Sequence, residues 1–200
     1  MLIAFEGLDQ SGKATQADAL RARLRQDGWR VHLLSFPDYR TPIGLEIRKA
    51  LAGEREFGPD VLQLLYIANR LEYRPRIDAW LEAGDVVVCD RYRASSVAYG
   101  EAHGVDPAWL EDAQRLLPVP AVTIFLDIPP EAGVKRKASG RDVFERNLAL
   151  LGRVRESYRR QAKQPGWVVI DATPAKAEVT AAVERAVLPR LARPSAHERS

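Results

Sequence analysis

Five short runs of apolar residues constrain the fold of this chain more than any other feature of its sequence. They do not alternate with polar residues, and they are Leu2–Phe5, Val31–Phe36, Val86–Cys89, Val122–Leu126 and Val168–Ile170. Uninterrupted apolar runs of this length are typical of strands that are buried on both faces of a parallel sheet. Because parallel strands need crossover connections, the sequence predicts an α/β fold with a five-stranded parallel sheet flanked by helices.

Stretches with a helical period of apolar residues separate these runs. Residues 15–26, 59–81, 146–162 and 176–191 carry apolar side chains three and four positions apart, which predicts an amphipathic helix in each. Glycines at positions 28, 84 and 166 stand between a predicted helix and the next strand, where glycine commonly ends a helix. We expect one domain over residues 1–193 and a frayed tail over residues 194–200.

A glycine-rich loop follows the first predicted strand directly and leads into a predicted helix. It fits the pattern G-x-x-x-x-G-K in the strand–loop–helix context that this pattern requires. Glycines let backbone N–H groups curl around phosphates, and the N-terminus of a helix favours negative charge. The sequence therefore predicts a three-layer P-loop NTPase fold that binds ATP. The expected ATP contacts are Gly7, Leu8, Asp9, Gln10, Ser11, Gly12, Lys13 and Ala14.

The loop departs from the usual pattern at its last position. Ala14 stands where a Ser or Thr commonly offers a hydroxyl to Mg²⁺, and we expect the next residue, Thr15, to point elsewhere. The ion would then rely on phosphates, water and carboxylates, which suits an ion that keeps several waters. Asp9 and Asp90 are the candidate ligands, because Asp90 ends the third predicted strand beside the loop. The adjacent Arg91 can bind a phosphate.

Positive charge is concentrated in one segment of the chain. The formal net charge is +3, yet residues 131–163 alone contain ten Lys or Arg and four Asp or Glu. A nucleic-acid-binding protein would usually spread such charge over a face with aromatic residues. We interpret the segment as a local clamp for a small anion, and we expect no nucleic-acid partner.

The cysteine content and the apolar runs bear on the cellular compartment. Cys89 is the lone cysteine, so the chain cannot form an internal disulfide. The first residues lack the basic flank of a signal peptide, and no apolar run approaches the roughly 20 residues that span a bilayer. We expect a cytoplasmic protein that does not associate with membranes.

Five segments carry motifs that occur in the same order in one enzyme family. They read FEGLDQSGK at residues 5–13, FPDY at 36–39, LLYIANR at 64–70, DRYRASSVAY at 90–99 and LDIPPE at 126–131. These segments resemble the thymidylate kinases, which are P-loop nucleoside monophosphate kinases, and the resemblance extends from residue 2 to about residue 191. It implies an enzyme that transfers the γ-phosphoryl group of ATP to dTMP with Mg²⁺, gives dTDP, and forms a homodimer.

The resemblance assigns residues to a dTMP site. Tyr66 would stack on the thymine ring, and Arg70, one helical turn later, would reach the base edge. Arg91 would bind the acceptor phosphate, and Tyr99 would occupy the space of a ribose 2′-hydroxyl. The other implied dTMP contacts are Asp9, Phe36, Tyr39, Arg40 and Ser96. Arg40 stands one residue beyond the matching arginine of some relatives, and packing in the core is the other role open to Tyr66.

The family supplies a positive charge to the moving phosphoryl group from the phosphate loop or from a lid. In the loop this chain has the uncharged Gln10, whereas a lid at about residues 133–146 is rich in Lys and Arg. We favour Arg141 as the residue that stabilises the transition state, with Arg136 as a helper. The expected catalytic set is Lys13, Arg91, Arg136 and Arg141, and the later alternatives are Arg146, Arg153 and Arg160. A solvated helix face is the other interpretation of this basic run.

Two other functions stay open on the sequence. One is a different small phosphoryl-transfer kinase, such as a deoxynucleoside kinase or a uridylate or cytidylate kinase. A deoxynucleoside kinase typically carries Asp-Arg-Ser where this chain reads Asp-Arg-Tyr at residues 90–92. The other is a nucleotide-binding module without catalysis, an alternative that Ala14 raises.

Replacing Arg141 with alanine tests the lid assignment. The variant should lose orders of magnitude in kcat and change the KM of either nucleotide far less, because the charge acts on the phosphoryl group in the transition state. Steady-state kinetics with ATP and dTMP measure these constants. An unchanged kcat would move the role to Arg136 or to a later arginine.

Overall fold

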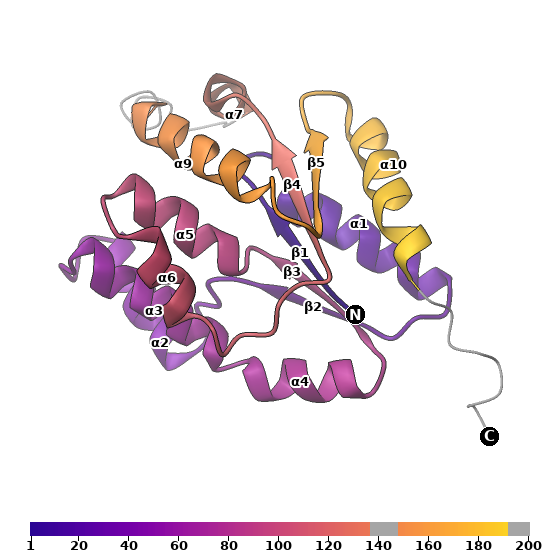
Figure 1. Ribbon diagram of the computed structural model, residues 1–200, viewed down its shortest axis with the longest axis horizontal. Coiled ribbons are helices and arrows are strands. Elements are labelled where there is room, and N and C mark those ends of the chain that lie inside the picture. Colours follow the sequence, from indigo (N-terminus) through magenta and orange to yellow (C-terminus); the bar gives the residue numbers. More distant parts are fainter. Residues whose placement is uncertain (137–147, 192–200) are drawn as a thin grey trace.

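A sheet of five parallel strands in the order β2-β3-β1-β4-β5 forms the centre of the structure, a computed structural model that describes residues 1–136 and 148–191 (Figure 1). The strands are β1 Leu2–Glu6, β2 Val31–Ser35, β3 Val86–Asp90, β4 Val122–Asp127 and β5 Trp167–Asp171. Each predicted apolar run is a strand, so the predicted α/β fold with a five-stranded parallel sheet is confirmed.

Helices cover both faces of the sheet (Figure 1). They are α1 Lys13–Gln26, α2 Pro42–Leu51, α3 Pro59–Leu71, α4 Arg74–Glu82, α5 Arg93–Ala102, α6 Pro107–Ala113, α7 Pro130–Arg136, α9 Leu148–Gln161 and α10 Lys176–Val187, followed by a 3₁₀ turn at Leu188–Arg190. Helices α1 and α10 pack together on one face, whereas α4, α5 and α9 lie on the other. In the part of the chain that the structure describes, no helix is long and apolar enough to cross a membrane.

Prolines account for two differences between the predicted and observed helices. The single helix predicted over residues 59–81 is wrong: α3 ends at Leu71, and α4 begins at Arg74 with Pro75 in its first turn. A proline has no N–H for a helical hydrogen bond and its ring clashes with the preceding turn, so it fits the start of a new helix. In the same way, α10 ends at Val187 and Pro189 lies in the 3₁₀ turn.

The helical period of apolar residues did not predict the short or weakly patterned helices. Helices α2, α5, α6 and α7 have ten residues or fewer, and α5 is buried on nearly all sides because it lies between α3, α6 and α9. A helix without one polar face shows no helical stripe in its sequence. The predicted glycine positions are confirmed, since Gly28, Gly84 and Gly166 all have φ between +76° and +86°.

The register of the strands brings three loops together at one edge of the sheet. In the parallel ladder Phe5 pairs with Asp90, and Asp90 also pairs with Ser35 at the end of β2. The carboxyl ends of β1, β2 and β3 therefore lie side by side. The loops that continue from them are residues 7–12, residues 36–41 and residues 91–92.

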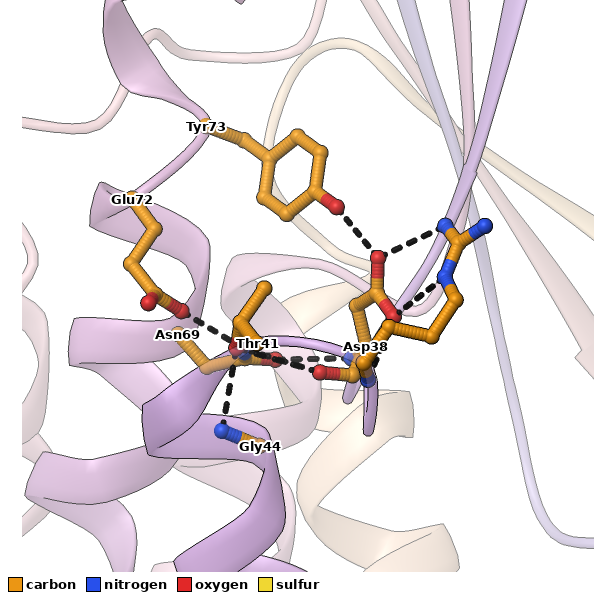
Figure 2. Close-up of polar contacts among 7 residues, drawn as sticks. Asp38, Thr41, Gly44, Asn69, Glu72 and Tyr73 are labelled. Atoms are coloured by element: carbon orange, nitrogen blue, oxygen red, sulfur yellow. Dashed lines mark hydrogen bonds and ion pairs between the residues drawn. The ribbon is translucent and has the colours of Figure 1, made fainter.

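A buried polar network holds the loop after β2 in place (Figure 2). The side chain of Asn69 on α3 is fully buried, and its Oδ1 accepts a hydrogen bond of 2.8 Å from the backbone N–H of Asp38. Its Nδ2 donates to the carbonyl of Asp38 at 3.3 Å and to Thr41 Oγ1 and Glu72 Oε2 at 2.9 Å each. The hydroxyl of Tyr73 donates to the Asp38 carboxylate. Helix α3 thus fixes the path of residues 38–41.

Close packing and charge strengthen the same network. The Arg40 guanidinium donates to both carboxylate oxygens of Asp38, at 2.9 and 2.7 Å. These bonds, with that from Tyr73, hold the pKa of Asp38 well below its usual range against the opposing effect of burial. A Cβ at Gly44 would lie only 1.8 Å from the Asp38 carbonyl oxygen, so only glycine lets α2 approach the loop this closely.

Replacing Asn69 with alanine should lower the free energy of unfolding by about 2 to 3 kcal/mol, because the buried N–H of Asp38 and the carboxylate of Glu72 lose their partner. Chemical denaturation measures this change. Arg115→Ala is the control, since Arg115 is exposed and pairs with Asp112 one turn away, and it should change the free energy by less than about 0.5 kcal/mol. Equal values for both variants would contradict a structural role of Asn69.

Candidate functional site

The phosphate loop has the backbone geometry that its glycines predict. Gly12 has φ +96° and directly precedes α1, so the first helical N–H groups face the space above the loop. Gly7 has φ +142°, and a Cβ there would lie 2.6 Å from the carbonyl oxygen of Leu126 at the end of β4. Glycine at position 7 is therefore required both by its φ and by the close approach of β4.

Lys13 is the buried cation of this loop. Its Nζ donates a 2.8 Å hydrogen bond to the carbonyl of Leu8. Burial, and next the positive charge of Arg91, lower the pKa of Lys13 to about 7, although Asp9, Asp90 and Glu6 oppose the shift. A phosphate placed at this ammonium group would favour its charged form.

A cavity of about 700 Å³ opens over the phosphate loop, and we call it the loop cavity. Its lining includes residues 9–14 of the loop and also Thr15, which was expected to point elsewhere, whereas the predicted ATP contacts Gly7 and Leu8 are not among its lining residues. The lining that sequence reasoning missed comes mainly from the loop after β5 and from α10, namely Ala172, Pro174, Lys176 and Val179. No motif in the sequence marks these four residues, because only the fold places α10 beside α1.

A second cavity of about 460 Å³ adjoins the first, and we call it the acceptor cavity. It brings together most of the residues predicted for the second substrate, which are Asp9, Phe36, Tyr39, Tyr66, Arg70, Arg91, Ser96 and Tyr99. Arg40 is not among the lining residues of either cavity, because its guanidinium is held by Asp38. Gln63 and His103 line the acceptor cavity and were not predicted.

Arg91 and Asp9 stand where the two cavities meet, since both residues line both. Arg91 Nη2 lies 2.5 Å from Asp9 Oδ1. The backbone of Arg91 has φ +64°, a left-handed conformation that is uncommon for a residue with a side chain. Such strain persists where the surroundings hold the residue firmly, and it is frequent at functional sites.

Three hydroxyl groups hold the Arg91 guanidinium. Its Nη1 donates to Ser95 Oγ at 3.0 Å and to Tyr158 Oη at 3.3 Å, and its Nη2 donates to Tyr99 Oη at 3.2 Å. The Cζ of Arg91 also lies 5.1 Å from the centre of the Tyr99 ring. Sequence reasoning gave Ser95 no role although it lies in the motif at residues 90–99, and it did not single out Tyr158, since a lone tyrosine on a distant helix carries no local signal.

Arg70 is a buried cation in the wall of the acceptor cavity. Its side chain is 2% exposed, and its Nη1 donates to Ser96 Oγ at 2.7 Å and to the carbonyl of Tyr66 at 3.3 Å. Its Nε has no hydrogen-bond partner among the described residues. Burial lowers the pKa of Arg70 and raises that of Tyr66 to about 12, so the Tyr66 ring stays neutral. The Cζ of Arg70 lies 5.9 Å from the centre of the Phe36 ring.

Asp90 lines the loop cavity and has a buried carboxylate oxygen. Its Oδ1 has no hydrogen-bond partner within the described part of the chain. Burial raises the pKa of Asp90, while the charges of Lys13 and Arg91 oppose the shift. Among the described residues no group of three or more His, Cys, Asp or Glu could hold a metal ion. A divalent ion here would thus take most of its ligands from phosphate and water, as Mg²⁺ does in such sites.

One arginine of the basic segment lines a cavity, whereas others bind neighbouring helices and strands. Arg136 lines the loop cavity, and its guanidinium donates to the carbonyls of Gln10 at 3.3 Å and Ala172 at 2.8 Å. Arg155 and Arg159 instead form ion pairs with Asp127 at the end of β4. Arg153 and Arg160 bind the last turn of α5 through the carbonyl of Ala102 and the carboxylate of Glu101.

These contacts change the interpretation of the basic run. The four arginines of α9 are neither a freely solvated face nor a clamp over the loop cavity, because each is tied to a neighbouring element. Within the described residues of this run, Arg136 alone lines the loop cavity. The favoured lid residue Arg141, the alternative Arg146 and most of the predicted lid lie outside the described residues.

Known proteins share this sequence and this fold. The family model described as "Thymidylate kinase" matches residues 5–183. The thymidylate kinase of Plasmodium falciparum is 36% identical over 86% of this chain and 81% of its own length. The probable thymidylate kinase of Methanothermobacter thermautotrophicus is 40% identical over 86% of each chain. A solved structure of thymidylate kinase from Candida albicans superimposes with a TM-score of 0.78 at 29% identity, covering 94% of this chain and 91% of the other.

The family match covers most of the chain and includes the phosphate loop, both cavities and the residues at their junction. The relatives also match over more than four-fifths of their own lengths. On sequence, fold and site geometry together, this chain belongs to the thymidylate kinase family.

Proposed function

We propose that this protein transfers the γ-phosphoryl group of ATP to dTMP and releases ADP and dTDP. The proposal rests on one observation: two cavities meet at Arg91 and Asp9. One cavity is built on a phosphate loop and suits a triphosphate. The other has aromatic walls and a buried cation, and it suits a base with a phosphate. A phosphoryl group that moves between them crosses the junction and never enters bulk water.

On the donor side, Lys13 and the backbone N–H groups of the loop bind the β- and γ-phosphates. Arg136 lies at the edge of the loop cavity, where its guanidinium can shift from backbone carbonyls to a phosphate. Asp90 and Asp9 would hold Mg²⁺ or its water shell, since both carboxylates belong to residues that line the loop cavity. When bound, the ion would neutralise charge on the phosphates.

On the acceptor side, the residues divide between base, sugar and phosphate. Tyr66 and Phe36 offer ring faces to the thymine, and Arg70, which lines the same cavity, would reach the edge of the base. Tyr99 stands where a ribose would need room for a 2′-hydroxyl. Arg91 binds the acceptor phosphate, and its attachment to three hydroxyls keeps it at the junction.

Transfer needs positive charge around the phosphoryl group in flight, because its oxygens carry developing charge in the transition state. Lys13 and Arg91 supply this charge from the two sides of the junction. We assign the remaining charge to Arg141 of the lid. An acceptor that is already an anion needs no general base to deprotonate it.

The proposal extends to the organisation of the protein. We infer that residues 1–193 form one kinase domain with a lid at about residues 133–146, since elements from β1 to α10 pack on a single sheet. Family likeness supports a homodimer, and together with the lone buried Cys89 it supports a cytoplasmic location.

A panel of acceptors tests the proposed reaction. With ATP and Mg²⁺, the protein should convert dTMP to dTDP with a kcat/KM at least about a hundredfold above that for UMP, CMP or thymidine, because each lacks a group that the acceptor cavity recognises or carries an extra one. Coupled detection of ADP and chromatography of the products measure this. Preference for another acceptor would identify a different kinase, and ATP binding without transfer would favour a binding module.

The pKa of Lys13 predicts uptake of a proton when ATP binds at pH 8. In the free protein a pKa of about 7 leaves most Lys13 neutral at this pH, and the triphosphate then raises the pKa and draws a proton from the buffer. Calorimetry in buffers of different ionisation enthalpy should find close to one proton per ATP at pH 8 and much less at pH 6.

Lys13→Arg is the matched control for this measurement. An arginine stays protonated at both pH values, so its binding heats should not depend on the buffer at pH 8. If the wild-type heats were equally independent of the buffer at pH 8, Lys13 would already be charged in the free protein.

A further inference from the structure

Glu6, the last residue of β1, is fully buried beside the site, and the proposed reaction gives it no role. Its Oε1 accepts hydrogen bonds from the backbone N–H groups of Tyr92 at 2.8 Å and Ser95 at 3.3 Å. Its Oε2 accepts from Ser95 Oγ at 2.6 Å and from Tyr158 Oη at 3.1 Å. One carboxylate on β1 thus binds the N-terminus of α5 and a tyrosine of α9.

The two oxygens of this carboxylate bind different groups. Oε1 satisfies N–H groups at the start of α5, whose own N-cap residue Tyr92 makes no side-chain capping bond. Oε2 receives the hydroxyl protons of Ser95 and Tyr158, the same two residues whose oxygens accept from Arg91 Nη1 at 3.0 and 3.3 Å. Each hydroxyl has a single proton, so a proton given to Glu6 leaves only lone pairs facing Arg91.

We propose that Glu6 is a positioning residue that acts on the acceptor phosphate through Arg91. By taking both hydroxyl protons it orients Ser95 and Tyr158 as acceptors, and they in turn hold the guanidinium at the junction of the two cavities. The inference rests on the proposed function, because it needs Arg91 to bind the phosphate of dTMP. It also explains how a residue with φ +64° is kept in one orientation.

Glu6→Gln separates positioning from helix capping. The main-chain N–H groups of Tyr92 and Ser95 cannot reverse, so the amide oxygen must stay on their side and the amide NH₂ must face the hydroxyls. The NH₂ group donates to Ser95 and Tyr158 where the carboxylate accepted. The two hydroxyls lie 2.9 Å apart, so one can donate to the other. The second hydroxyl proton has no acceptor and turns toward Arg91, although the cap on α5 is kept.

The experiment is steady-state kinetics of Glu6→Gln, Arg91→Ala and the double variant, with thermal unfolding of each. Glu6→Gln should raise the KM for dTMP and lower kcat/KM by about tenfold or more, with the KM for ATP unchanged within about twofold. In the Arg91→Ala background it should add less than about twofold, since the residue through which it acts is gone.

Glu101→Gln is the matched control. Glu101 on α5 also accepts a hydroxyl of α9, from Ser157 at 2.6 Å, but it lines neither cavity and makes no bond to Arg91. This variant should leave both KM values unchanged. If Glu6→Gln behaved like Glu101→Gln, or cost as much with Arg91→Ala as without it, the inference would be overturned and Glu6 would be a structural cap.

A second variant keeps the test decisive if Glu6→Gln does not fold. Replacing Ser95 with alanine and Tyr158 with phenylalanine together removes both acceptors of Arg91 Nη1 and leaves the Glu6 cap on α5 in place. The KM for dTMP should rise as in Glu6→Gln and again show no further rise with Arg91→Ala; an unchanged KM would overturn the inference.

Arg91→Ala by itself checks the proposed function. An unchanged KM for dTMP in that variant would mean that Arg91 does not bind the phosphate, whatever Glu6 does.

Discussion

The parallel pairing of β1 with β3 is the interaction on which the rest of this structure depends. Because Phe5 pairs with Asp90, the two strands end at the same level, and the phosphate loop begins beside Asp90 and Arg91. A shift of the register by one residue would also turn every side chain of a strand to the opposite face. Glu6 would then no longer reach α5 and α9, so the register fixes both the donor loop and the support of Arg91.

The site concentrates buried cations and leaves their charge only partly neutralised. Lys13 hydrogen-bonds a backbone carbonyl, and Arg70 contacts a hydroxyl and a carbonyl. Burying such groups without a carboxylate partner costs free energy, which the lowered pKa of Lys13 reports. Two anionic substrates would remove this cost on binding. The electrostatics of the free protein are thus complementary to phosphates.

The network around Asp38 gives the acceptor cavity a rigid wall. Asn69 joins α3 to the loop after β2, and the same helix presents Tyr66 and Arg70 to the cavity. Phe36 and Tyr39 enter the cavity from that loop. Since the loop and the helix are joined by buried hydrogen bonds, the residues that would meet the base and those that would meet the phosphate keep their relative positions.

Local features of the sequence determined the five strands, the phosphate loop and its glycines, because apolar periodicity and backbone conformation depend on near neighbours. The acceptor residues, in contrast, were predicted from the resemblance to a family. Long-range pairing decided the rest. Only the tertiary structure tied Arg155 and Arg159 to Asp127, whereas the local signal of Pro75 already marks the break in the helix predicted over residues 59–81. The tertiary structure also joined Glu6 to Tyr158, 152 positions away. A charged residue that folding buries needs a partner, and the packing of distant elements determines which residue that partner is.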